Sequence, residues 1–299
     1  MQFNKQIRKV TDESVQNAKR FVHQLPTQDL IAVFIAFALL PIAFLFEVTF
    51  VLSFWFQLFS EEWVVRVVPL LFLGFNVYAN MYKTYVVGPN GKSSQLPSVL
   101  KPGHRYCHAC NLNSPPRAYH CPVCNVCIFR RDHHCSFLSV CIGHFNQRYF
   151  LAAAVNLWII SATCMLWNWH FLWLAIPNFG VLQLWHLMLP HIAFTLRFIT
   201  FYQFFSIMVF VSSATTVAFV TYLIGAQIFC FYRGQTRVEY LLDIYAYNLG
   251  FLENVRQALG RRWYLVFISP FIPSPLESDG LSYRVCNVEN KESKDVKYL

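Results

Sequence analysis

The 299-residue chain has little charge, because only 13% of its residues are Asp, Glu, Lys or Arg. Soluble globular domains carry about 25% charged residues, so the deficit argues against a soluble domain. Disordered chains are polar and poor in aromatics, and they are excluded by a composition that is 56% hydrophobic and 18% aromatic. Ten cysteines are too dilute for a disulfide-stapled secreted module. The chain is therefore a hydrophobic one whose few cysteines need another explanation.

Charge is absent over several long stretches, and a helix needs about 20 apolar residues to cross a bilayer. We predict membrane spans near residues 30–52, 63–82, 150–172 and 205–230. The stretch 149–232 has room for two spans or three. Pro177 and Pro190 make its middle a poor span, so we expect a loop at the membrane interface there. We find no internal repeat.

The basic residues give an independent test of this topology. Four spans place 22 of the 24 Lys and Arg residues on one side of the membrane, which the positive-inside rule assigns to the cytosol. The first 28 residues are polar and do not have the pattern of a cleavable signal peptide. A nucleic-acid partner is disfavoured, because the basic residues are scattered rather than arranged in a stripe. We predict an all-α integral membrane protein with four transmembrane helices and both termini cytosolic.

Seven of the ten cysteines fall between Cys107 and Cys141. Cytosolic thiols stay reduced, and Cys and His at short spacing suit tetrahedral zinc, which takes four ligands per structural site. With His120, His133 and His134 the segment offers ten candidate ligands, two more than two zinc sites need. A spare Cys and His could carry out chemistry. A RING-type adaptor in ubiquitin transfer is disfavoured, because His120 directly precedes Cys121.

The order of residues in this segment resembles the DHHC-type protein S-acyltransferase (palmitoyltransferase) family. The matching positions are Pro115, Arg117, His120-Cys121, Asp132-His133-His134-Cys135, Cys141-Ile142-Gly143 and Asn146. The resemblance implies two structural zinc ions. Their ligands would be Cys107, Cys110, His120 and Cys127 in one site, and Cys121, Cys124, His134 and Cys141 in the other.

The resemblance also implies that Asp132, His133 and Cys135 are catalytic. Cys135 would attack a long-chain acyl-CoA such as palmitoyl-CoA, and a membrane-proximal cysteine of a protein substrate would then take the acyl group. The implied surroundings are the lipid bilayer of the Golgi or endoplasmic reticulum. Basic side chains could contact the phosphates of CoA, and the candidates are Arg117, Arg130 and Arg131. Packing of the zinc domain against lipid is an equally good role for these arginines.

The expected organisation has five parts. These are a cytosolic N-terminal segment 1–29, transmembrane helices 1 and 2 in 30–82, a cytosolic zinc-binding domain 83–149, transmembrane helices 3 and 4 with a lumenal loop in 150–232, and a cytosolic tail 233–299.

Some positions depart from the family pattern. Phe137 stands where a Trp is usual, Ser139 and Val140 replace two Asn, and Arg237 replaces the second Thr of a Thr-Thr-x-Glu motif. In relatives that Thr contacts the triad Asp, so we expect Arg237 to form an ion pair with Asp132 instead. These departures leave an alternative open, a catalytically weak, zinc-stabilised membrane scaffold of the same fold.

Overall fold

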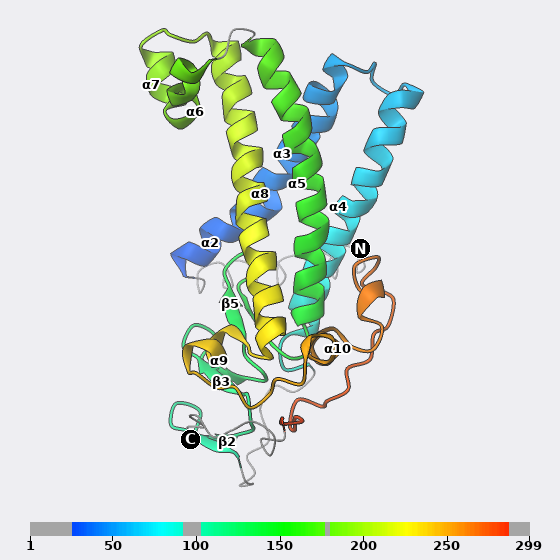
Figure 1. Ribbon diagram of the computed structural model, residues 1–299, viewed down its shortest axis with the longest axis vertical. Coiled ribbons are helices and arrows are strands. Elements are labelled where there is room, and N and C mark those ends of the chain that lie inside the picture. Colours follow the sequence, from blue (N-terminus) through cyan, green and yellow to red (C-terminus); the bar gives the residue numbers. More distant parts are fainter. Residues whose placement is uncertain (1–25, 92–102, 177–179, 287–299) are drawn as a thin grey trace, which may run out of the picture.

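The computed structural model describes residues 26–91, 103–176 and 180–286. Four long apolar helical segments form a bundle, with small β-hairpins and the tail at one end, here called the hairpin end (Figure 1). The segments long and apolar enough to cross a membrane are Thr27–Phe54, Glu61–Val87, Gln147–Ala175 and Phe201–Arg233. Each predicted span lies inside one of them, so the four-span fold is confirmed. Most of the expected segment 1–29 and the end of the tail lie outside the described residues.

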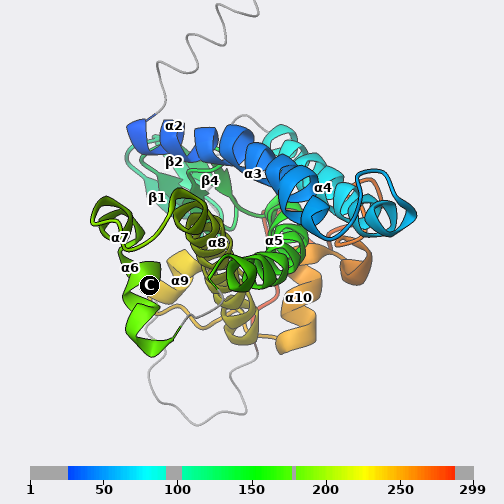
Figure 2. The same ribbon diagram turned by 90° about the horizontal axis from the view of Figure 1, so that it is seen from above.

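The first span is not a uniform α-helix. It consists of α2 (Thr27–Phe34), a π-helical turn (Ile35–Leu39), α3 (Leu40–Phe46), a second π-helical turn (Glu47–Val51) and a 3-10 turn (Leu52–Phe54). Pro41 stands just after the first π turn. Proline lacks an N–H and clashes with the carbonyl four residues earlier, and a π turn relieves such a clash by inserting one residue. Figure 2 shows this segment lying across the other helices.

The other three spans are α4 (Glu61–Val87), α5 (Gln147–Ala175) and α8 (Phe201–Arg233). Helix α5 packs against both α4 and α8 (Figure 2). Its run Ala152–Ala154 is buried, and small residues let helix backbones approach closely in a membrane. Near the opposite end of the bundle, the Asn168 amide donates to Glu47 at 2.6 Å and ties α5 to the first span. A charged or polar group inside a span is costly unless it has such a partner.

The connection between the third and fourth spans holds only short helices in its described residues. These are a 3-10 turn (Val181–Gln183), α6 (Leu184–Met188) and α7 (Pro190–Thr195). None is long enough to cross a bilayer, so the expected interface loop agrees with the structure. Helix α8 then begins at Phe201, and the hydroxyl of its N-cap residue Thr200 accepts from the backbone N–H of Gln203.

At the hairpin end three antiparallel β-hairpins follow one another. Their strands are β1 (Arg105–Cys107) with β2 (Leu112–Ser114), β3 (Tyr119–Cys121) with β4 (Val126–Ile128), and β5 (His133–Cys135) with β6 (Val140–Ile142). The register pairs Cys107 with Leu112, Cys121 with Val126 and Cys135 with Val140. Each hairpin therefore repeats the previous one after 14 residues. The expectation of no internal repeat is wrong.

The tail wraps around the hairpin end through α9 (Arg237–Leu241), α10 (Phe251–Leu259) and a 3-10 turn (Trp263–Leu265). Gly234 ends α8 with a φ of +67°, and a Cβ there would lie 2.5 Å from Asn248 Cα. Only glycine fits this left-handed position, where the tail crosses the end of the helix. Asn254 holds the same junction by donating to the carbonyl of Phe231 at 2.8 Å.

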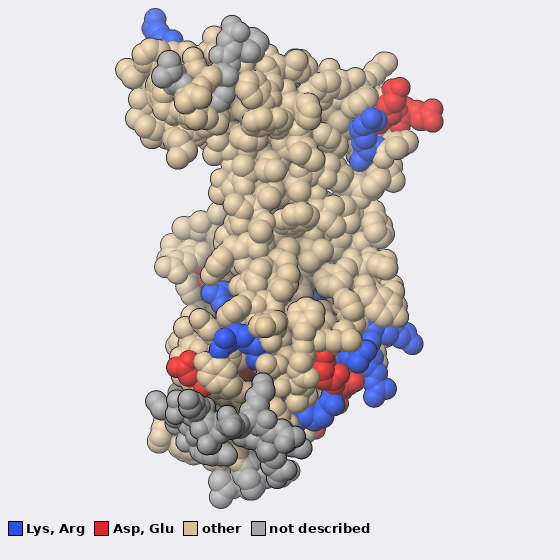
Figure 3. Space-filling view, in the orientation of Figure 1, with Lys and Arg blue, Asp and Glu red and all other residues tan. Residues whose placement is uncertain are grey.

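The surface of the described residues separates by charge. Figure 3 shows a broad uncharged waist over the helices, charged side chains gathered at the hairpin end, and a few at the opposite end. Arg66 and Arg197 are the two basic residues that the sequence assigns to the opposite side. The uncharged waist is the part of the molecule that fits the hydrocarbon core of a bilayer.

Candidate active site and metal centres

The first two hairpins bring together one Cys/His group. The ligand atoms of Cys107, Cys110, His120 and Cys127 all lie within 4.8 Å of one another. Cys110 Sγ is 3.2 Å from His120 Nδ1 and 3.7 Å from Cys127 Sγ. Tetrahedral zinc with bonds of about 2.3 Å separates two sulfurs by about 3.8 Å. The donor set and the spacing therefore fit a zinc ion.

The second and third hairpins form the other group. The ligand atoms of Cys121, Cys124, His134 and Cys141 again lie within 4.8 Å of one another, and Cys124 Sγ is 3.6 Å from Cys141 Sγ. His134 turns Nδ1 toward the sulfurs and Nε2 toward Asp29 Oδ2 at 2.8 Å. A carboxylate on the far nitrogen of a metal-binding histidine fixes the ring and its tautomer. The sequence offered no signal for Asp29, which lies 105 residues before His134 at the start of the first span.

The two groups interleave because each takes two cysteines from the turn of one hairpin and a His–Cys pair from the strands of the next. His120 is paired with Cys127, and His134 with Cys141. The third hairpin repeats the turn, with Cys135 at the place of Cys121. The place of Cys124 is taken by Leu138. After Ile142 the chain enters α5 rather than a fourth hairpin. Cys135 therefore belongs to neither group.

His133 and Cys135 are two residues apart on β5, so their side chains share one face of the strand. His133 Nδ1 lies 2.7 Å from Asp132 Oδ2. Burial would lower the pKa of His133, but hydrogen bonds with Asp132 and Cys135 raise it to about 9. The imidazole therefore holds a proton near neutral pH while its other side faces the sulfur. The three residues have the geometry of a nucleophile, a base and a carboxylate that orients the base.

Asp132 is buried, with an exposed fraction of 1%. Burial would raise its pKa, but hydrogen bonds from His133, the Arg237 backbone N–H and Gln227 hold the pKa at about 2. Gln227 Nε2 donates to Oδ2 at 2.7 Å, and the backbone N–H of Arg237 donates to Oδ1 at 2.9 Å. A carboxylate with three donors stays ionised. The sequence pattern alone does not single out Gln227, although a polar residue within a predicted span is itself a signal of function.

The expected ion pair between Arg237 and Asp132 is wrong. The guanidinium of Arg237 instead lies 3.5 Å from the Tyr222 hydroxyl. Arg237 is the first residue of α9, whose N-cap Thr236 and third residue Glu239 form a capping box. Backbone N–H groups in the first turn of a helix have no partner within the helix, so this one is free to donate to Asp132. The contact needs the backbone and not a particular side chain.

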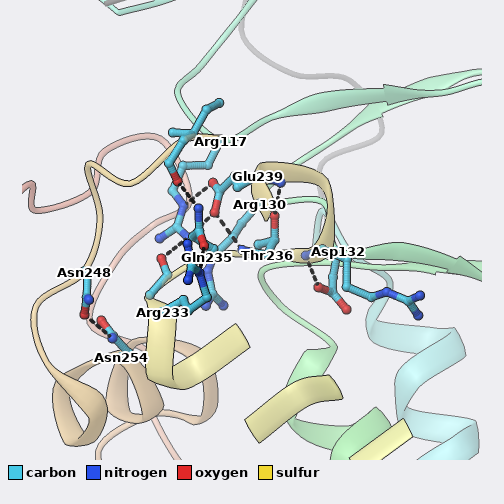
Figure 4. A network of polar contacts seen from close by, with 12 residues as sticks. Arg117, Arg130, Asp132, Arg233, Gln235, Thr236, Glu239, Asn248 and Asn254 are labelled. Atoms are coloured by element: carbon cyan, nitrogen blue, oxygen red, sulfur yellow. Dashed lines mark hydrogen bonds and ion pairs between the residues drawn. The ribbon is translucent and has the colours of Figure 1, made fainter. Parts of the chain in front are cut away.

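The three arginines considered for CoA phosphates have protein partners. Arg117 is buried and donates to both oxygens of Glu239 at 2.6 Å, and Glu239 also accepts from the backbone N–H of Thr236 (Figure 4). Burial would lower the pKa of Arg117, but Glu239 raises it. Arg130 is buried against Gln147, and Arg131 donates to the carbonyl of His120 at 2.9 Å. Contact with CoA stays a prediction, and for Arg117 and Arg130 it requires a buried guanidinium to leave its partner.

The site is joined to the spans at two points. Cys135 lies in a hydrophobic cluster with residues of the first three spans, among them Ala36, Met81 and Phe150. Asn146 donates to the carbonyls of Thr84 and Cys141 and accepts from the N–H of Gly143. A Cβ on Gly143 would lie 2.6 Å from the carbonyl of Phe129, so the close approach of the segment after β6 to the segment after β4 requires glycine there. The thiol thus sits where the hairpins meet the membrane helices.

Comparison with known proteins agrees with this geometry. A sequence family described as DHHC palmitoyltransferase matches residues 100–244. The chain is 35% identical over 192 residues to a probable palmitoyltransferase ZDHHC24 of Danio rerio, covering 62% of this chain and 64% of that protein. Proteins with the same printed name from Mus musculus and Rattus norvegicus are 36% and 35% identical over 197 residues, each with 62% of this chain and 66% of the relative covered.

The matched part of this chain spans slightly less than two thirds of the length of these relatives. The family match, residues 100–244, contains the three hairpins, both Cys/His groups, the third and fourth spans and the capping box of α9. The family match covers slightly less than half of the chain, and over residues 100–244 the chain is similar to the DHHC palmitoyltransferase family.

Proposed function

We propose that the chain is a protein S-acyltransferase that moves a long-chain acyl group, such as palmitoyl, from acyl-CoA to cysteine thiols of proteins. The observation that carries the proposal is the position of Cys135. It repeats a metal-binding cysteine of the previous hairpin, it is excluded from both Cys/His groups, and it lies beside His133 in the hydrophobic cluster of the spans. A reactive thiol at the border of membrane and cytosol suits a donor with an apolar chain and a charged head group.

In the first step His133 holds the proton of Cys135 and Asp132 orients the imidazole. The thiolate attacks the thioester carbonyl of acyl-CoA, a new thioester forms on Cys135, and CoA leaves as a thiol with the proton from His133. In the second step a substrate cysteine loses its proton to His133 and attacks the acyl-Cys135 bond. Cys135 is regenerated as a thiol. The two steps make a ping-pong scheme.

The metal ions have a structural role in this proposal. Cys107, Cys110, His120 and Cys127 would hold one zinc ion, and Cys121, Cys124, His134 and Cys141 the other. Sites with four protein ligands leave no open position for substrate. Zinc would supply folding stability to segments whose strands are only three residues long, and no step of the transfer passes through it.

The proposal includes the topology and the surroundings. The hairpin end faces the cytosol, together with the segment 1–29, the domain 83–149 and the tail 233–299. The spans lie in 30–82 and 150–232, in a membrane of the Golgi or endoplasmic reticulum. Partners are the bilayer, acyl-CoA and proteins with membrane-proximal cysteines. The charge distribution of Figure 3 supports this orientation, because the hairpin end carries most of the described charge.

The test is acylation of the purified full-length chain in detergent by labelled palmitoyl-CoA. We expect one hydroxylamine-sensitive label per chain on the wild type and none on Cys135→Ser. Equal labelling of both chains, or no label on a folded wild type that retains its zinc, would favour the catalytically weak scaffold instead.

A further inference from the structure

Arg130 is a buried cation with no carboxylate directly beside it. Its exposed fraction is 3%, and its guanidinium donates to Gln147 Oε1 at 2.7 Å. None of the ion pairs within the described residues includes it. Burying an uncompensated charge is costly. By contrast, the neighbouring buried arginine, Arg117, pairs with Glu239. The carboxylates whose charges act on Arg130, Glu239 and Asp132, do so without a direct ion pair.

Two glutamine amides connect Arg130 to Asp132 by hydrogen bonds. Gln147 Nε2 donates to Gln227 Oε1 at 2.7 Å, and Gln227 Nε2 donates to Asp132 Oδ2 at 2.7 Å. Gln147 is the first residue of α5, and Gln227 lies near the end of α8. Both side chains are buried, with exposed fractions of 1% and 2%. The chain of contacts runs from Arg130 through both amides to the carboxylate that orients His133.

The direction of this chain is fixed at both ends. A guanidinium can only donate hydrogen bonds, and an ionised carboxylate can only accept them. Gln147 must therefore turn its oxygen to Arg130, and Gln227 must turn its NH₂ to Asp132. With both amides reversed, two donors would face each other at Arg130 and two acceptors at Asp132. Amide orientations usually have to be assigned from their surroundings, and here the two charged ends allow one assignment.

We propose that Gln147 and Gln227 are positioning residues for the triad. Their two aligned amides link Arg130 to Asp132 through hydrogen bonds. This role rests on the acyltransferase function proposed above. The Gln227 N–H holds Oδ2, the oxygen that also receives His133 Nδ1–H. With Oδ2 fixed, His133 keeps one ring orientation, with its other nitrogen toward Cys135. The third and fourth spans thereby contribute directly to the alignment of a residue in the hairpins.

The first test is Gln147→Glu in the full-length chain in detergent. The new carboxylate pairs directly with Arg130 and also accepts from Gln227. The Gln227 amide then turns its oxygen toward Asp132. Fold and packing volume are kept, so we expect thermal stability and zinc content to equal those of the wild type. Single-turnover acylation of Cys135 by palmitoyl-CoA should slow by at least about tenfold, the scale of a lost hydrogen bond to a charge. The half-saturating palmitoyl-CoA concentration should stay unchanged, because neither amide touches the donor.

A second variant, Gln227→Met, removes the last donor while keeping an unbranched side chain, and it should slow acylation at least as much. Gln203→Glu is the matched control, an amide-to-carboxylate change in the first turn of the same helix α8, and it should acylate at the wild-type rate. Wild-type rates in both Gln147→Glu and Gln227→Met would overturn the proposal, as would parallel losses of stability and rate in Gln147→Glu. Failure of the wild type itself to acylate would overturn the enzyme function instead.

Discussion

The second and third hairpins are nearly the same piece of chain put to two uses. Residues 119–128 read YHCPVCNVCI and residues 133–142 read HHCSFLSVCI. Both hairpins give a His–Cys pair to a Cys/His group, but only the second also gives its turn cysteines. In the third, Leu138 stands where Cys124 stands, and His133 where Tyr119 stands. The loss of one cysteine and the gain of one histidine separate a turn that can bind metal from the turn whose cysteine we propose as the nucleophile.

The largest difference between the two hairpins is expected when the equivalent cysteine is removed from each of them. Cys121→Ala opens a four-ligand zinc site, and structural zinc supplies much of the folding free energy of such modules. We expect it to lose zinc and most of the folded yield. Cys135→Ala should keep about two zinc ions per chain, the number that two four-ligand sites hold, and lose acylation only. Metal analysis and gel filtration measure both. Equal zinc loss in the two variants would contradict the separation of roles.

Arg117 tests how the first two hairpins are held, since it lies between them and pairs with Glu239 in the tail. Arg117→Met leaves Glu239 buried without its partner, and we expect a loss of about 3–5 kcal/mol in the free energy of unfolding. The control is Arg256→Met, which removes an exposed pair with Glu253 and should cost less than about 1 kcal/mol. Chemical denaturation in detergent gives both values. A similar cost for the two variants would mean that the buried pair does not hold the hairpins to the tail.

Asp29 contacts the histidine of only one of the two Cys/His groups among the described residues, so its removal should affect the two groups differently. Among the described ion pairs it contacts His134, and none involves His120. Removal of a carboxylate behind a metal-binding histidine weakens metal affinity by about 10–100-fold. For Asp29→Asn we expect one of the two zinc ions to transfer to a chelator more readily while the other is unaffected. Two ions that become labile together would argue that Asp29 supports the whole module.

Leu138→Cys gives the turn of the third hairpin two cysteines with two residues between them, as in the second hairpin. We expect metal analysis to find the same zinc content as in the wild type, because no fourth hairpin among the described residues offers a His–Cys pair. A third bound zinc would show that a His–Cys pair is not needed to complete a site.

A small effect on acylation is expected at Arg237, whose backbone rather than side chain contacts Asp132. Arg237→Ala should change the acylation rate by less than about twofold, because surface substitutions that keep the backbone contact cost about 0.5 kcal/mol or less. Thr236→Ala, which removes the N-cap that orders this turn, should cost about 1 kcal/mol of stability. A large loss in Arg237→Ala alone would restore a role for the guanidinium.

The features that could be predicted are those that local sequence determines. The four spans follow from uncharged runs, and the segment with ten candidate ligands follows from short Cys and His spacings. The 14-residue repeat was also visible, since Cys107, Cys121 and Cys135 are equally spaced, but the changed ligands of the third copy hide it.

What could not be predicted depends on partners far apart in the chain. Asp29 meets His134, Gln227 meets Asp132, and Arg117 meets Glu239, across 105, 95 and 122 residues. The error over Arg237 has a different cause. A sequence shows which side chain stands at a position, but a free N–H in the first turn of α9 is a property of the backbone. A resemblance between side chains cannot reveal such a contact.

The donors around Asp132 come from β5, α8 and α9, and the amide pair behind one of them begins on α5. The triad itself lies within residues 132–135, but the groups that hold its carboxylate come from elements far apart in the chain. Under the proposed function, the alignment of His133 with Cys135 would therefore require the third and fourth spans to be packed against the hairpins, and metal binding by the hairpins alone would not complete the site.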